Sequence, residues 1–138
     1  MSTRLEEKEK KILRTLERLA HESVKGIPII VEGRNDVETL RALNIEGKIM
    51  EAKAGGKSIL TFLSEVEMFG VREFILLLDF DRRGKELTKH LMRQLEQKRI
   101  KSNIFFWKRL MSIVGRDVKD VEGLTSYLKT LHRDIRDT

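Results

Sequence analysis

The chain has 138 residues, of which 40% are hydrophobic and 36% are charged, as is typical of a single globular domain. It has no cysteine, which excludes disulfides and thiolate metal sites, and no apolar run approaches the roughly 20 residues that span a bilayer. The N-terminus lacks the uninterrupted apolar stretch of a secretory signal. We therefore expect a cytoplasmic protein that does not enter membranes.

The balance of charge is positive. Lys and Arg total 28 and Asp and Glu total 22, which leaves a net charge of +6 distributed along the chain. Such an excess favours a polyanionic partner such as nucleic acid. The alternative is that the charge serves only solubility.

In the first half of the chain, two helices and two strands are predicted. Residues 4–23 form a charged helix in which Leu and Ile recur at helical spacing. Residues 27–31 are a short run of β-branched residues, which predicts a strand buried on both faces. A loop and a helix follow, with Asn35 or Asp36 as the N-cap. Residues 48–52 are a weaker strand candidate.

The second half continues the alternation of strands and helices. Ser58 begins a helix that Gly70 ends. Residues 74–78 are the strongest strand, a helix over 85–98 follows, and 103–106 form the next strand. Two more helices complete the chain, over residues 107–114 and 124–135.

This alternation predicts an α/β fold. The strands are apolar without a polar alternation, which indicates a mainly parallel sheet with helices on both faces. We expect one domain, residues 1–138, whose four-stranded sheet has the order 2-1-3-4 with right-handed crossovers.

Three carboxylates follow the two best strands. Glu32 comes directly after Val31, Asp79 directly after Leu78, and Asp81 two residues later. In the order 2-1-3-4 these strands are neighbours, so their carboxyl ends bring the three side chains to one crevice. Clustered carboxylates repel one another unless protons or a cation neutralise them. Oxygen ligands without nearby His or Cys indicate Mg²⁺, or Mn²⁺ in its place.

Each of these acidic residues also has a plainer interpretation. Asp81 stands just before a helix and is placed to cap it, and Glu32 is alternatively an ordinary loop residue. A second acidic group, Asp117, Asp120 and Glu122, follows the last strand. It either completes the metal site or lies in a solvated loop.

Two segments resemble the signature motifs of the Toprim domain: VEGRND, residues 31–36, and DFDRRG, residues 79–84. This domain is shared by topoisomerases, bacterial-type primases and several families of nucleases. The resemblance covers residues 26–106, so that residues 1–24 add an N-terminal helix and residues 107–138 a C-terminal helical extension. It implies a Rossmann-like Toprim fold and Mg²⁺-dependent phosphoryl chemistry on nucleic acid.

The resemblance also implies roles for individual residues. Glu32 corresponds to the general acid or base and is a candidate third ligand beside Asp79 and Asp81, which correspond to the metal ligands. Three residues are expected to support the site: Gly33, Asp36 and Gly84.

Basic residues near the two motifs are candidate phosphate contacts. Arginine can grip a phosphate with two donors. The candidates beside the carboxylates are Arg34, Arg82, Arg83 and Lys85, with solvated loop charges as the alternative. Lys57 lies in a glycine-rich turn, residues 54–58, that lacks the earlier glycine of a P-loop. The helix N-terminus that follows this turn is still able to contact a phosphate.

Together these features favour Mg²⁺-dependent hydrolysis of phosphodiester bonds in RNA or DNA. The alternative is a non-catalytic nucleic-acid-binding module of a larger assembly. A topoisomerase also needs a nucleophilic tyrosine in a separate domain, whereas the one tyrosine, Tyr127, falls in the last predicted helix. The sequence leaves open the choice of RNA or DNA, the number of ions and the oligomeric state.

Overall fold

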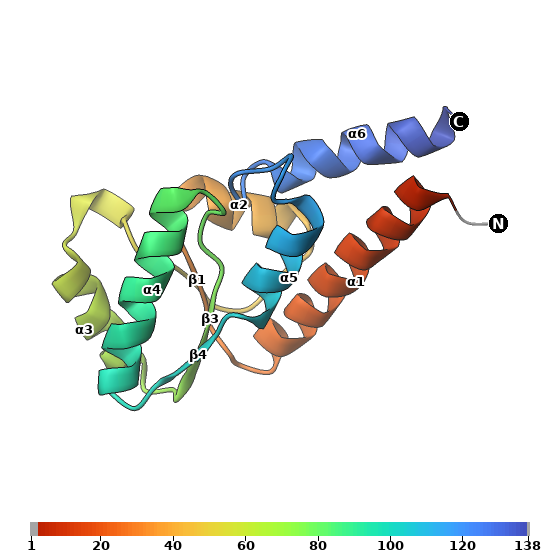
Figure 1. Ribbon diagram of the computed structural model, residues 1–138. Coiled ribbons are helices and arrows are strands. Elements are labelled where there is room, and N and C mark those ends of the chain that lie inside the picture. The colour runs from red at the N-terminus through yellow and green to blue at the C-terminus, as the bar shows by residue number, and fades with distance from the viewer. Residues whose placement is uncertain (1–2, 138) are drawn as a thin grey trace.

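The computed structural model describes residues 3–137. Within this range the centre of the molecule is a parallel sheet (Figure 1). Its strands are β1 (Ile29–Val31), β2 (Ile49–Glu51), β3 (Glu73–Leu76) and β4 (Lys101–Asn103). The order is β2-β1-β3-β4 and every neighbouring pair is parallel, so the predicted order 2-1-3-4 is confirmed.

Helices cover both faces of this sheet (Figure 1). They are α1 (Arg4–Val24), α2 (Arg34–Ala42), α3 (Ile59–Phe69), α4 (Arg82–Gln97), α5 (Phe105–Val114) and α6 (Leu124–Arg136), with a short 3-10 turn, η1 (Ala54–Gly56). The helices α3 and α4 pack on one face, and α1, α2, α5 and α6 pack on the other.

The two central strands explain why the sheet needs both layers. Ile29 and Ile75 point to the core shared with α1, whereas Ile30 and Leu76 point to the core shared with α3 and α4. All four side chains are fully buried. Successive residues of a strand face opposite sides, so an apolar run of this kind is stable only between two layers of helices.

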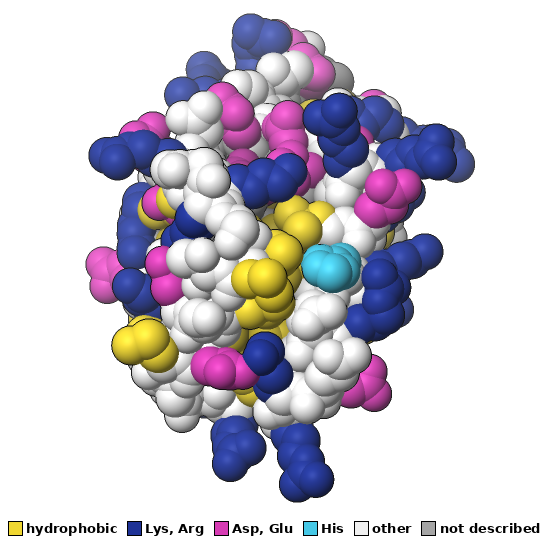
Figure 2. Space-filling view, turned by 90° about the vertical axis from the view of Figure 1, so that its left-hand side faces the viewer, with side chains coloured by type: hydrophobic (Ala, Val, Ile, Leu, Met, Phe, Trp, Pro, Cys, Tyr) yellow, Lys and Arg dark blue, Asp and Glu magenta, His cyan; other side chains and the backbone are white. Residues whose placement is uncertain are grey.

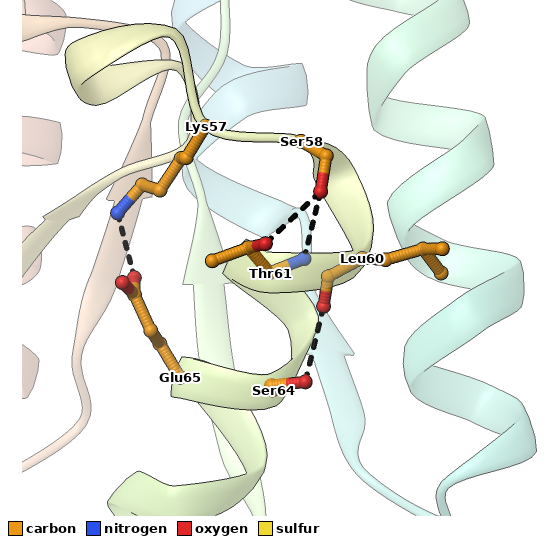
Figure 3. Close-up of polar contacts among 6 residues, drawn as sticks. All are labelled: Lys57, Ser58, Leu60, Thr61, Ser64 and Glu65. Atoms are coloured by element: carbon orange, nitrogen blue, oxygen red, sulfur yellow. Dashed lines mark hydrogen bonds and ion pairs between the residues drawn. The ribbon is translucent and has the colours of Figure 1, made fainter.

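Local signals predicted several helix ends correctly. The Ser58 side chain accepts a hydrogen bond from the main chain of Thr61 and caps α3, as Figure 3 shows. Gly70 ends the same helix with φ of 81°, the left-handed conformation that favours glycine.

The predicted strand over residues 103–106 is wrong. The strand β4 is Lys101–Asn103, and α5 already begins at Phe105. The side chain of Asn103 accepts a hydrogen bond from the main chain of Phe105, which turns the chain out of the sheet. Phe106 and Leu110 are then buried at helical spacing, and this burial outweighs the strand preference of consecutive aromatic residues.

Two predicted helix starts are also corrected. The helix α2 begins at Arg34 with Gly33 as its N-cap, so neither Asn35 nor Asp36 occupies that position. The helix α4 begins at Arg82, three residues earlier than predicted. Only Glu32 and Gly33 separate β1 from α2, and residues 77–81 separate β3 from α4, so each helix begins within the motif itself.

Positive charge is present on the α3 and α4 side of the molecule as well as elsewhere. Figure 2 shows Lys and Arg side chains around the edge of this face and hydrophobic side chains exposed along its middle. On α3 the exposed hydrophobic residues include Leu60 and Met68.

None of the helices in residues 3–137 combines the length and the apolar character that crossing a membrane requires.

Candidate active site

An acidic pocket of about 350 Å³ lies beyond the carboxyl ends of β1 and β3. Five carboxylates line it: Glu32, Asp36, Asp79, Asp120 and Glu122. Its other lining residues are Gly33, Arg34, Asn35 and Lys53. The parallel pairing of β1 with β3 places the ends of both strands at one edge of the sheet, and the main chain of Leu77 extends this pairing through a 2.8 Å hydrogen bond to the Ile30 carbonyl.

Glu32 and Asp79 form the centre of the acidic pocket. Burial, a hydrogen bond with Glu32 and the negative charges of Glu32, Asp36 and Asp120 together raise the pKa of Asp79 to about 8. A hydrogen bond between two carboxyl groups requires that one of them carries a proton. At neutral pH the pair therefore retains a proton unless another positive charge replaces it.

One oxygen of Asp79 is left without a donor. Asp79 Oδ1 is buried, and no hydrogen-bond partner for it occurs in the part of the chain that the structure describes. A buried polar atom without a partner is unfavourable, and such atoms in native proteins call for an explanation such as a bound ion.

Asp36 is buried beneath the first motif. Its carboxylate accepts a 3.0 Å hydrogen bond from the main chain of Gly33, which fixes the turn that follows Glu32. Burial, together with the charges of Glu32, Asp120 and Glu122, raises the pKa of Asp36 against the opposing effect of the Gly33 hydrogen bond. Asp36 was predicted to support the site, and in the structure its side chain holds the turn that follows Glu32.

Lys53 was not singled out from the sequence. Its main-chain N–H donates to the Glu32 carbonyl at 3.0 Å, and its Nζ lies 3.4 Å from Glu32 Oε1. The Lys53 side chain is 57% exposed, so solvent weakens this ion pair. Lys53 follows β2, the neighbour of β1, so the predicted strand order already contained a signal for it.

The second acidic group divides between two places. Asp120 and Glu122 line the acidic pocket, because the main chain of Phe80 donates to the Lys119 carbonyl at 2.7 Å and holds this loop against the second motif. Asp117 instead accepts 3.2 Å hydrogen bonds from Lys8 and from the Tyr127 hydroxyl. These hydrogen bonds lower the pKa of Asp117.

Asp81 caps α4, as the simpler of its two interpretations from the sequence predicted. Its Oδ1 accepts a 2.8 Å hydrogen bond from the main chain of Gly84, and this bond caps α4. Asp81 is exposed and is not among the residues that line the acidic pocket. The structure therefore brings Glu32 and Asp79 together at the acidic pocket, whereas Asp81 lies outside the lining, at the start of α4.

Among the predicted phosphate contacts beside the carboxylates, Arg34 lines the acidic pocket and the other three do not. Arg34 lines the acidic pocket and pairs with Glu38. Arg82, Arg83 and Lys85 are exposed in the first turn of α4, which starts beside the second motif.

Lys57 lies outside the acidic pocket. Its Nζ is 2.6 Å from a carboxylate oxygen of Glu65 (Figure 3). The ammonium group also lies over the Phe62 ring, 5.4 Å from its centroid. Its expected contact with a phosphate would require this ion pair to open.

The donor set of the pocket suits a hard divalent cation. In residues 3–137 no group of three His, Asp or Glu side chains is already arranged to hold a metal ion. The unpartnered Asp79 Oδ1 and the adjacent Glu32 carboxyl nevertheless fit one, because a cation there would replace the proton that the pair otherwise retains.

Comparison with known proteins shows a matching family model and similar sequences. The family model described as Toprim domain matches residues 27–107. The chain is 37% identical to a UPF0292 protein of Methanocaldococcus jannaschii, over 86% of this chain and 90% of that protein. It is 34% identical to a UPF0292 protein of Methanosarcina barkeri, over 84% of this chain and 79% of that protein.

A solved structure shares the fold. A putative protein from Aquifex aeolicus superimposes with a TM-score of 0.64, covering 79% of this chain and 94% of that one. The two sequences are 20% identical, so this likeness concerns the fold alone.

Proposed function

Because this chain belongs to the Toprim domain family and, within it, resembles the small UPF0292 proteins of archaea, we propose that it hydrolyses phosphodiester bonds in RNA or DNA with a divalent metal ion. The family indicates a function that involves metal binding and nucleic acid. Hydrolysis, and the residues that carry it out, are our inference from the acidic pocket.

The adjacency of Glu32 and Asp79 is the observation that carries this proposal. Burial, together with the adjacent Glu32 carboxyl, raises the pKa of Asp79 to about 8, so the ionised form of this pair destabilises the site. A protein that only binds nucleic acid gains nothing from negative charge facing phosphates. A metal-dependent enzyme benefits from this negative charge, because the same carboxylates hold the cation.

Asp79 and Glu32 are the residues that would hold Mg²⁺, or Mn²⁺, which when bound supplies Lewis acidity toward phosphate oxygens and lowers the pKa of a coordinated water. Asp81 is the third proposed ligand. Its Oδ1 already accepts the Gly84 hydrogen bond, so its contribution to the site comes from the other carboxylate oxygen. Two bonds to one carboxylate are compatible, since its oxygens offer about four lone-pair sites.

Glu32 is the proposed general acid or base. It is mostly buried beside Asp79, and the Lys53 ammonium 3.4 Å away helps to hold it in place. Proton transfer needs a carboxyl oxygen within about 3 Å of the reacting oxygen or of a bridging water. Arg34 and Lys53 line the same pocket and are the nearest cations for the phosphate.

The test is a cleavage assay with matched variants. Labelled single- and double-stranded RNA and DNA are incubated with the protein in Mg²⁺, in Mn²⁺ or in chelator. We expect metal-dependent cleavage that Glu32→Gln and Asp79→Asn each reduce by at least about 100-fold, within the range of general acid–base contributions.

The control variants are Glu96→Gln on α4 and Asp134→Asn on α6, which make the same chemical changes at exposed positions. They should cleave like the unmodified protein. Cleavage that survives in Glu32→Gln and Asp79→Asn would refute the assignment, and salt-sensitive binding without product in either metal would identify a binding module instead.

A further inference from the structure

A second hollow, separate in its lining from the acidic pocket, carries positive charge. It has a volume of about 500 Å³ and lies between the N-terminal half of α1 and the C-terminal half of α5. These two helices pack side by side on one face of the sheet (Figure 1). Five cationic side chains line this basic cleft: Arg4, Lys8, Lys11, Arg109 and Arg116.

The charge of the basic cleft is poorly compensated. Lys8 pairs with Asp117 at 3.2 Å, whereas the other four cations have no acidic partner within ion-pair distance in residues 3–137. Glu7 is the one carboxylate in the lining, so the lining carries a charge of +4. Like charges at one concave surface repel one another and raise the local potential for anions.

The chemistry of the lining indicates which anion fits. The side chains other than the charged ones are Ser112 and Ile113, so the cleft offers neither an aromatic platform for bases nor a sizeable apolar surface. Several cations over the length of two helix turns match a ligand with regularly spaced negative charges. The sugar–phosphate backbone of nucleic acid is such a ligand, and its contacts need no base recognition.

The basic cleft and the acidic pocket are joined by a short segment. Arg116 lines the cleft and Asp120 lines the pocket, and four residues span at most about 14 Å. Two hydrogen bonds hold this segment. Lys8 donates to the Asp117 carboxylate near one end, and the main chain of Phe80 donates to the Lys119 carbonyl near the other. At a rise of about 3.4 Å per nucleotide, this upper limit corresponds to at most about four nucleotides of one strand.

We propose that the basic cleft between α1 and α5 binds the backbone of the nucleic acid within about four nucleotides of the phosphate that enters the acidic pocket. The position of that phosphate rests on the proposed function. Binding at the cleft does not depend on cleavage, so the two can be tested apart.

The experiment compares two double variants that remove the same charges. The cleft variant, Lys11→Gln with Arg109→Gln, removes two cations from the basic cleft. The α4 variant, Lys89→Gln with Arg93→Gln, also removes one Lys and one Arg, but from the opposite face of the sheet. All four residues are exposed, which favours normal folding of both variants. Circular dichroism and thermal unfolding check this, and Lys11→Arg with Arg109→Lys retains the charge.

Binding is measured by fluorescence anisotropy with labelled 20-nucleotide RNA and DNA in chelator, from 50 to 200 mM NaCl. Each phosphate contact contributes about −0.7 to −0.9 to the slope of log K against log salt concentration. The cleft variant should therefore lose about 1.4 to 1.8 from the magnitude of this slope and bind roughly tenfold more weakly, or worse, at 100 mM NaCl. The α4 variant and the charge-retaining variant should bind like the unmodified protein.

Two results would overturn the inference: a cleft variant that binds RNA and DNA unchanged, or an α4 variant that loses as much affinity. If cleavage proceeds while the cleft variant binds normally, the cleft proposal alone fails. If the cleft variant loses binding and no metal supports cleavage, the cleft proposal stands and the proposed hydrolysis fails.

Discussion

Gly84 lies directly against the main chain of Asp79: a Cβ atom added to Gly84 would overlap the Asp79 carbonyl oxygen. The first turn of α4 therefore packs on the segment that connects β3 to α4, at Asp79. The Trp107 indole N–H donates to the same carbonyl at 3.3 Å and holds it from the other side. The position of the Asp79 carboxylate thus depends on a residue five positions later that has no side chain.

Replacing Gly84 by alanine should destabilise the protein. The added methyl group forces α4 and Asp79 apart, and overpacking of this kind costs about 1–3 kcal/mol, more than the helix propensity that alanine gains. Urea unfolding monitored by circular dichroism measures the loss. Gly33→Ala is the control: it has open space around its Cβ position and an extended backbone, so it loses only the advantage of glycine over alanine as an N-cap, less than about 1 kcal/mol. Equal losses in both variants would contradict this explanation.

The stability of the metal-free protein should fall as pH rises from about 5 to 9. Asp79 has a folded-state pKa raised to about 8, and a carboxyl group raised in this way favours folding at low pH and loses that contribution as pH passes through the folded pKa. Asp79→Asn removes the titrating group, so its Tm should be higher than that of the unmodified protein at pH 9 and should decline less over this range. Parallel Tm profiles for the two proteins would show that Asp79 does not control this decline.

Mg²⁺ or Mn²⁺ should stabilise the protein, and more so at pH 8.5 than at pH 6. A cation competes with the proton that Glu32 and Asp79 retain, and a ligand that binds only the folded state raises Tm in proportion to the logarithm of its concentration. Thermal unfolding across a metal titration measures this effect. Asp79→Asn should abolish the Tm increase, whereas Asp134→Asn should keep it. An increase that persists without the Asp79 carboxylate would place the ion elsewhere.

The two roles of Asp81 can be separated by two substitutions. Asparagine caps helices about as well as aspartate, so Asp81→Asn should unfold at nearly the same urea concentration as the unmodified protein. Asp81→Ala loses the bond to Gly84 and should cost about 1 kcal/mol.

If Asp81 also binds metal, both substitutions should weaken the metal-dependent rise in Tm. A full rise in Asp81→Asn would leave Asp81 as a helix cap without a part in the metal site.

The sequence alone determined the sheet, the helix ends with strong local signals and the meeting of Glu32 with Asp79. Apolar strands without polar alternation need two helical layers, and neighbouring parallel strands place their carboxyl ends together, so these features follow from local pattern and chain direction. Ser58 and Gly70 act within one turn of the chain, which is why their capping roles were predictable.

Only the tertiary structure decided which other side chains join that pair. Asp120 and Glu122 reach the acidic pocket through a loop held by Phe80, which depends on a contact between distant segments. The strand order places Lys53 near this edge of the sheet, but its ion pair with Glu32 depends on side-chain positions that the order does not give. The basic cleft likewise exists only because α1 packs against α5. Long-range packing also explains why residues 105–106, predicted as strand, are helical. Burial of Phe106 against the core outweighs the strand preference of aromatic residues.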